Sequence, residues 1–284
     1  MESKKFISAN LTVGENPLYN HLDGNLYYVD IRGKCFYCAD CDGKVLKKVD
    51  LPEQIGCMAI CSDGDFLLGM ETGVYLLDKN GQIKLAHAPQ KILGRRFNDG
   101  KVGADGAYYL GTTDAESKGA FYRLKNGQLT KLLDGVNCSN GLDWSLDGSK
   151  MYYVDSPLKK IEVFDFDPNA KNPLSNRRTC CDLKDVIPEN AVPDGMCIDQ
   201  QGYLWVAIWN GGNVLKIDTE KSLVVDQIRV EVNKPSSCAF VGENLDKLLI
   251  TSANFLEQDK NAGSLYIANV NAKGFKVNLY KKGE

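Results

Sequence analysis

The chain has 284 residues, of which 43% are hydrophobic and 25% charged, and its formal net charge is -3. These values are ordinary for a soluble globular protein, and the lack of a basic block argues against a nucleic-acid partner. No apolar run approaches the roughly 18 residues of a membrane span, and residues 1–5 lead into no apolar signal segment. We therefore expect a cytoplasmic protein that does not associate with membranes.

Short apolar and aromatic strands recur along the chain every 40–50 residues or so, which is the period of a four-stranded propeller blade. Each follows a turn signal such as Asp-Gly, and a second strand follows each one. In chain order these predicted strands are 26–30, 66–70, 107–111, 151–155, 204–207 and 247–251. Six such units predict an all-β, six-bladed β-propeller with four-stranded antiparallel blades around a central channel, formed as a single domain by residues 1–284. The longest interruption, 168–193, is expected to be a blade connection with a loop.

The cysteines and histidines offer few metal or catalytic sites. Cys35, Cys38 and Cys41 form a C-x-x-C-x-x-C run, but no fourth cysteine follows before Cys57 and there is no second C-x-x-C or histidine pair. All ten cysteines are therefore expected to be reduced and mostly packed as small hydrophobic residues. His21 and His87 are the only histidines, so histidine-ligated zinc and a histidine-paired nucleophile are both poorly supplied.

Polar residues flanked by glycine or proline precede four of the predicted blades. They occur in Gly14-Glu15-Asn16-Pro17, Arg96-Phe97-Asn98-Asp99-Gly100, Ser139-Asn140-Gly141 and Pro193-Asp194-Gly195. Each motif alone is ordinary turn chemistry. Because they recur at matching phase in four blades, we expect them to converge at the mouth of the channel.

This polar set also suits a divalent cation. Glu15 and Asp194 supply two carboxylates, and Asn140 adds a neutral amide oxygen. An all-oxygen donor set favours Ca²⁺, Mg²⁺ or Mn²⁺, although Zn²⁺ also accepts carboxylates. The sequence therefore predicts one divalent ion, with positions left for water and substrate.

The same motifs, in this order, resemble those of the gluconolactonase/regucalcin family, which includes senescence marker proteins and luciferin-regenerating enzymes. The resemblance covers essentially the whole chain and is most specific in 96–102, 140–145 and 193–199. It implies a six-bladed propeller with Glu15, Asn140 and Asp194 as metal ligands. It also implies that Arg96 and Asn98 contact substrate and that Asp194 is the general base.

Glu116 aligns with a further substrate-contacting glutamate of the family. Related members carry a longer insertion here, whereas only residues 114–119 separate the Gly-Thr turn from the next strand in this chain. We therefore expect a more open pocket and broad tolerance of lactones.

These inferences predict a metal-dependent hydrolase that opens small lactones, most simply sugar lactones, as a monomer or weak oligomer. Asp194 would accept a proton from the attacking water while the metal polarises the carbonyl. Three alternatives are a calcium-binding regulatory protein with little catalysis, a metal-dependent phosphotriesterase, and a partner-binding platform.

Overall fold

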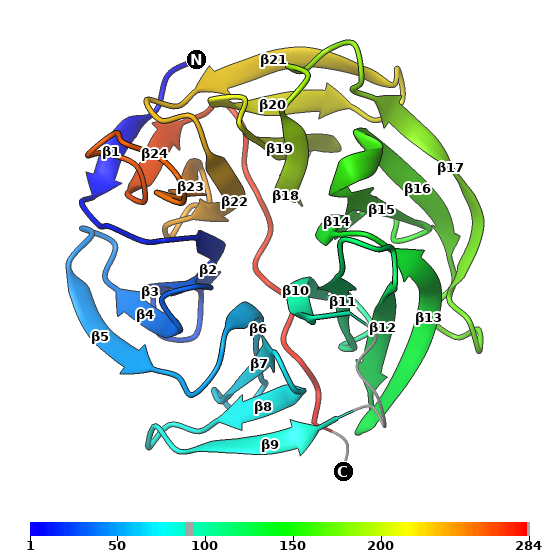
Figure 1. Cartoon of the computed structure of the whole chain (residues 1–284). Helices are drawn as coiled ribbons and strands as arrows, with labels where there is room; N and C mark the ends of the chain where they lie inside the picture. Colours follow the sequence, from blue (N-terminus) through cyan, green and yellow to red (C-terminus); the bar gives the residue numbers. More distant parts are fainter. Residues whose placement is uncertain (89–93, 283–284) are drawn as a thin grey trace.

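The protein is described by a computed structural model covering residues 1–88 and 94–282. Six four-stranded antiparallel sheets surround a central channel, which confirms the predicted six-bladed propeller (Figure 1). No helix in the described ranges is both long and apolar enough to span a membrane.

Each of the first five blades is built from strands that are consecutive in sequence, and the first of them lines the channel. The first three blades contain β2 (Gly14–Asn20), β3 (Asn25–Asp30), β4 (Cys35–Ala39) and β5 (Val45–Asp50); β6 (Ile55–Ile60), β7 (Phe66–Met70), β8 (Val74–Leu77) and β9 (Ile83–His87); and β10 (Arg96–Val102), β11 (Tyr108–Thr113), β12 (Gly119–Lys125) and β13 (Gln128–Val136).

The next two blades follow the same order, and a short 3-10 helix lies within the fourth. They contain β14 (Ser139–Trp144), β15 (Lys150–Asp155), η1 (Ser156–Leu158), β16 (Lys160–Phe166) and β17 (Leu174–Asp182); and β18 (Val192–Ile198), β19 (Tyr203–Trp209), β20 (Asn213–Asp218) and β21 (Leu223–Arg229). The expectation that 168–193 is only a connection was therefore wrong, because it contains β17. Five successive residues of β17 are exposed, so its sequence lacks the alternation of apolar and polar residues that indicates a strand.

The sixth blade closes the ring with strands from both ends of the chain. It contains β22 (Pro235–Val241), β23 (Lys247–Ser252) and β24 (Leu265–Asn269), with β1 (Lys4–Ile7) as its outer strand. The pairing of β1 with β24 brings Lys4 opposite Ile267 and Ile7 opposite Leu265. The ring is thus held shut by backbone hydrogen bonds between segments about 260 residues apart.

The hydrophobic core is divided into six clusters, and each one fills the space between two neighbouring blades. The second strand of each blade faces a neighbour on both sides, which explains its nearly continuous apolar sequence. Fully buried aromatic residues such as Tyr109, Tyr153 and Trp205 lie on these strands. Packing between blades therefore sets the relative positions of the inner strands.

The C-terminal segment crosses one end of the channel (Figure 1). Gln200 of the fifth blade donates its backbone N–H to the Lys273 carbonyl, Asn278 bonds the Val102 carbonyl, and Tyr280 donates to the Ile60 carbonyl. Val102 is the last residue of β10, whereas Arg96, its first residue, lies at the other end. The segment therefore closes the end of the channel opposite Arg96.

Candidate metal centre

The sequence motifs lie on the innermost strands themselves, not in turns that precede the blades. The antiparallel register of these strands is interrupted between Glu15 and Leu18, Phe97 and Gly100, Ser139 and Leu142, and Pro193 and Met196. Such irregularities re-aim side chains that regular pleating would point elsewhere. The matching phase seen in the sequence thus reflects one bulge repeated in successive inner strands.

Two glycines of these motifs, Gly141 and Gly195, are required by close packing between inner strands. A Cβ added at Gly141 would lie 2.7 Å from the Asp194 carbonyl oxygen and 2.8 Å from the Met196 backbone nitrogen. A Cβ at Gly195 would lie 2.0 Å from the Ser237 Oγ. Strands β14 and β18, which carry Asn140 and Asp194, are consequently held against each other without an intervening side chain.

Three buried carboxylates gather at the bulges. Glu15, Asp99 and Asp194 are 6%, 7% and 7% exposed. Burial raises the pKa of Glu15 well above its usual range, and the negative charges of Asp194 and Asp99 raise it further. Burial also raises the pKa of Asp194 well above its usual range, and Asp99 adds to that rise while Arg96 opposes it. The three carboxylates thus repel one another, and the positive charge near them does not offset their combined negative charge.

Asp99 is a part of the site to which sequence reasoning gave no role, although it lies within a quoted motif. Its Oδ1 accepts hydrogen bonds from the Asn16 side chain at 3.3 Å and the Gly100 backbone N–H at 2.7 Å. Burial raises its pKa, although Lys101 and these hydrogen bonds act in the opposite direction. Asp99 is therefore held by protein donors, and it acts on Glu15 and Asp194 mainly through its charge.

A chain of hydrogen bonds fixes the two asparagines. Arg96 Nη1 donates to Asn98 Oδ1 at 2.6 Å, and Asn98 Nδ2 donates to Asn140 Oδ1 at 3.0 Å. Asn140 Nδ2 donates to Ser156 Oγ at 2.7 Å, and that hydroxyl donates to the Pro193 carbonyl at 2.7 Å. The sequence gave no signal for Ser156, which comes from η1 and orients Asn140 through this bond.

These residues fit a hard divalent cation. Within the described ranges no side chain donates a hydrogen bond to the Asp194 carboxylate, and the backbone N–H of Gly195 opposes the rise of its pKa. Asn140 Oδ1 accepts one hydrogen bond, so a second lone pair is free. Across residues 1–88 and 94–282, no three His, Cys, Asp or Glu side chains are grouped to hold a metal by themselves. The donor set is therefore mixed, with Glu15 and Asp194 as carboxylates and Asn140 as an amide.

A pocket of about 660 Å³ opens beside Arg96 at this end of the channel. It is lined by residues from the first four blades: Arg32, Gln54, Glu71, Arg95, Arg96, Thr113, Ala115, Asn137, Cys138 and Pro157. Burial lowers the pKa of Arg96, but the neighbouring Cys138 and Glu15 oppose that change. The volume lies within the range of small-molecule sites.

Glu116 is not brought into this pocket. It lies on the turn between β11 and β12, its side chain is 71% exposed, and it forms an ion pair with Lys118. Its neighbour Ala115 does line the pocket. The structure thus joins Glu15, Arg96, Asn98, Asn140 and Asp194 into one site and leaves Glu116 at its rim.

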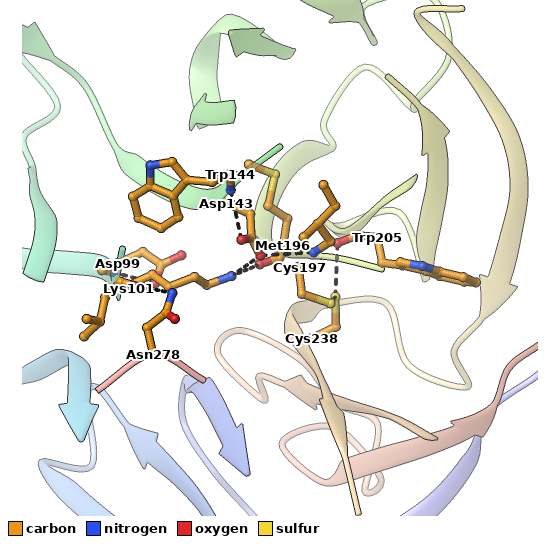
Figure 2. Close-up of polar contacts among 12 residues, drawn as sticks. Asp99, Lys101, Asp143, Trp144, Met196, Cys197, Trp205, Cys238 and Asn278 are labelled. Carbon is orange, nitrogen blue, oxygen red and sulfur yellow. Dashed lines mark hydrogen bonds and ion pairs between the residues drawn. The ribbon is translucent and has the colours of Figure 1, made fainter. Parts of the chain in front are cut away.

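A partly buried ion pair spans the channel below the carboxylates (Figure 2). Lys101 Nζ reaches from β10 to Asp143 Oδ2 on β14 at 2.7 Å and to the Met196 carbonyl on β18 at 2.9 Å. Burial alone would lower the pKa of Lys101, but the charge and hydrogen bond of Asp143, with the charges of Cys197 and Asp99, together outweigh burial and raise it. Asp143 also accepts the Ile198 backbone N–H at 3.0 Å. This network ties three inner strands together beneath the candidate metal ligands.

Comparison with known proteins agrees with this architecture. Residues 13–254 match the family model described as SMP-30/Gluconolactonase/LRE-like region. Regucalcin from Xenopus laevis is 33% identical over 94% of each chain. A luciferin-regenerating enzyme structure superimposes with a TM-score of 0.88 at 27% identity over 96% of each chain. A gluconolactonase from Xanthomonas campestris shares the fold, with a TM-score of 0.75 at 21% identity over 93% of this chain and 87% of its own. The chain belongs to the SMP-30/gluconolactonase/LRE-like family.

Proposed function

We propose that this protein is a metal-dependent lactonase that opens small lactones, with a sugar lactone as the simplest substrate. The observation that carries the proposal is the buried set of Glu15, Asn140 and Asp194, whose charged neighbour Arg96 lines a pocket of about 660 Å³. Buried carboxylates whose pKa values are raised by one another mark a site that is completed by a cation. Membership of a family named for gluconolactonase supports the choice of reaction.

Glu15, Asn140 and Asp194 would hold the ion, and the all-oxygen set favours Ca²⁺, Mg²⁺ or Mn²⁺ over Zn²⁺. When bound, a divalent cation supplies Lewis-acid polarisation of the lactone carbonyl. The bonds from Asn98 and Ser156 hold the amide of Asn140 in one orientation. Preorganisation of this kind avoids rearrangement during the reaction.

Asp194 would act as the general base. Its carboxylate has an oxygen free of side-chain donors in the described part of the chain, so it can accept a proton from an attacking water. Arg96 and Asn98 lie next to it and would bind oxygens of the substrate or of the new carboxylate. Arginine suits the carboxylate because its donors form a rigid fork.

The proposed role of Glu116 requires a rearrangement. Its carboxylate would have to leave Lys118 and turn toward the pocket that Ala115 already lines. We therefore place Glu116 as a substrate contact only in the bound state.

The test separates the ligand role of Asp194 from its role as base. Asp194→Asn should bind metal more weakly, and at saturating metal its kcat should still be about 10²–10⁴-fold below the parent, because an amide is a poor base. Asn140→Ala removes a ligand but no base, so excess metal should recover much of its activity. If saturating metal restores Asp194→Asn to the parental rate, Asp194 is not the base.

The same assay decides between the lactonase and its alternatives. The parent protein, freed of metal by chelation and reloaded with each ion in turn, is offered a panel of lactones and a phosphotriester. Metal binding without hydrolysis of any of them would favour a calcium-binding role, and hydrolysis of the phosphotriester alone would favour a phosphotriesterase.

A further inference from the structure

We propose that the preferred substrate is a lactone carrying a second, anionic group such as a carboxylate or phosphate, which Arg32 and Arg95 bind at the rim of the pocket. This inference rests on the proposed lactonase function and names its substrate class. A neutral sugar lactone would occupy the same site without using these two side chains.

The rim of the pocket is positively charged. Three arginines line it, and Glu71 is the one acidic residue among the lining residues described by the structure. Glu71 already accepts a hydrogen bond from Gln54 at 3.0 Å. In residues 1–88 and 94–282, neither Arg32 nor Arg95 forms an ion pair. Both guanidinium groups are therefore available to a ligand.

The two arginines approach the pocket from different blades. Arg32 lies in the turn between β3 and β4, and its guanidinium carbon is 3.9 Å from the centroid of the Phe255 ring. Arg95 directly precedes β10, where its backbone N–H donates to the Thr113 carbonyl at 2.9 Å. Stacking on an aromatic ring leaves the edge of a guanidinium group free to bind an anion. The ring contact places Arg32 and the backbone bond places Arg95 without pairing either guanidinium with an anion.

Charge balance favours an anion at the rim over one deeper in the site. With a divalent ion bound, that ion and Arg96 together offset the charges of Glu15, Asp99 and Asp194. Among the described residues that line the pocket, Arg32 and Arg95 face one carboxylate, that of Glu71, while Glu116 outside the lining is paired with Lys118. One positive charge is therefore left over, and a neutral lactone cannot compensate it. A carboxylate or phosphate on the substrate would do so through the forked geometry that arginine presents.

The experiment compares two lactones that differ only at this group. D-Glucaro-1,4-lactone carries a C6 carboxylate where D-glucono-1,4-lactone carries a hydroxymethyl group. We expect the Ca²⁺-loaded protein to hydrolyse the first with a kcat/KM about ten-fold higher or more, since a hydrogen bond to a charged group is worth roughly that factor at a partly exposed site. The preference should shrink in 0.5 M salt, where exposed charges are screened.

The variants assign that preference to the rim. The double variant Arg32→Gln/Arg95→Gln should bring the ratio of the two kcat/KM values close to one. Arg229→Gln makes the same chemical change on the outer strand β21, remote from the pocket, and should leave the ratio at the parental value. A parental ratio near or below one, with both lactones hydrolysed, would overturn the inference and leave the lactonase proposal standing.

A binding measurement keeps the inference testable if no lactone is hydrolysed. D-Glucarate and D-gluconate differ by the same carboxylate, and their affinities for the Ca²⁺-loaded protein are read by calorimetry without any reaction. We expect glucarate to bind about ten-fold more tightly, and this advantage should disappear in the double variant. Equal affinities in the parent protein would refute the anion subsite whatever the outcome of the activity assay.

Discussion

Replacing Gly141 by alanine should damage the metal centre without touching any donor atom. The new Cβ would lie 2.7 Å from the Asp194 carbonyl oxygen. An ordinary carbon–oxygen contact is about 3.4 Å, so β14 and β18 must separate locally by about 0.7 Å. Asn140 directly precedes the substituted residue, and Asp194 is the residue whose backbone the new Cβ would displace. Both donors therefore move relative to Glu15.

The expected loss follows from the size of that movement. A misplacement of about 1 Å can reduce the rate by about 10²-fold, and overpacking costs about 1–3 kcal/mol of folding free energy. We expect Gly141→Ala to raise the Kd for Ca²⁺ at least ten-fold, measured by titration calorimetry on protein that circular dichroism shows to be folded.

A matched glycine separates loss of stability from loss of the site. Gly135 on β13 has φ of 73°, and an added Cβ there would meet no atom within 4 Å. Alanine at this position should cost about 1–2 kcal/mol through its left-handed backbone yet leave the Kd for Ca²⁺ unchanged. A parental Kd in folded Gly141→Ala would show that the strand contact does not position the ligands.

Three further predictions concern the charges and thiols. Glu15→Gln should stay folded but lose bound metal, as measured by elemental analysis; an unchanged metal content would remove Glu15 from the site. The pKa values of Glu15 and Asp194 are raised in the folded protein, so these groups retain protons that the unfolded chain has released. Their contribution to the stability of the metal-free protein therefore falls as pH rises above about 4. The parent should lose more stability over this rise than Asp194→Asn does, and its Ca²⁺ affinity should increase over the same range. All ten cysteines are free in the structure, so thiol titration of unfolded, unreduced protein should find ten, and a lower number would indicate disulfides.

The blade count could be predicted because the second strands carry an unusually clear pattern. β3, β11 and β19 are packed between two neighbouring blades, so almost every position is buried and each strand contains a run of three or more apolar or aromatic residues. The outer strands could not be found in this way. β5 and β17 expose most of their side chains, and their sequences satisfy only backbone pairing with one neighbour. Strand pairing between ends of the chain, as in β1 with β24, has no local signal at all.

The sequence predicted which polar residues lie together better than it predicted the structure around them. Glycines beside asparagine or aspartate are typical of turns, and this is how the motifs were interpreted. In the structure Gly100, Gly141 and Gly195 lie inside strands and do not have positive φ. They are needed because neighbouring strands approach too closely for a Cβ. Contacts of this kind, like the bond from Ser156 to Asn140, depend on segments that meet only after folding.

The repeated bulge also explains how a six-fold arrangement supports an asymmetric site. All six inner strands break register at the same place, including β6 between Ile55 and Cys57 and β22 between Pro235 and Ser237. In these two blades the bulged positions hold Gly56 and Ser236. A Cβ at Gly56 would lie 2.3 Å from the Asn98 carbonyl oxygen, and Ser236 Oγ donates to the Gly14 carbonyl.

Small residues in two blades therefore pack against the neighbouring strands that carry donors, while the other four blades supply the polar side chains. If all six positions carried carboxylates, mutual repulsion would exceed what one divalent ion can offset. The architecture provides six equivalent positions around one axis. The side chain at each position then decides whether a blade supplies a polar group to the site or packs against the neighbouring strand that does.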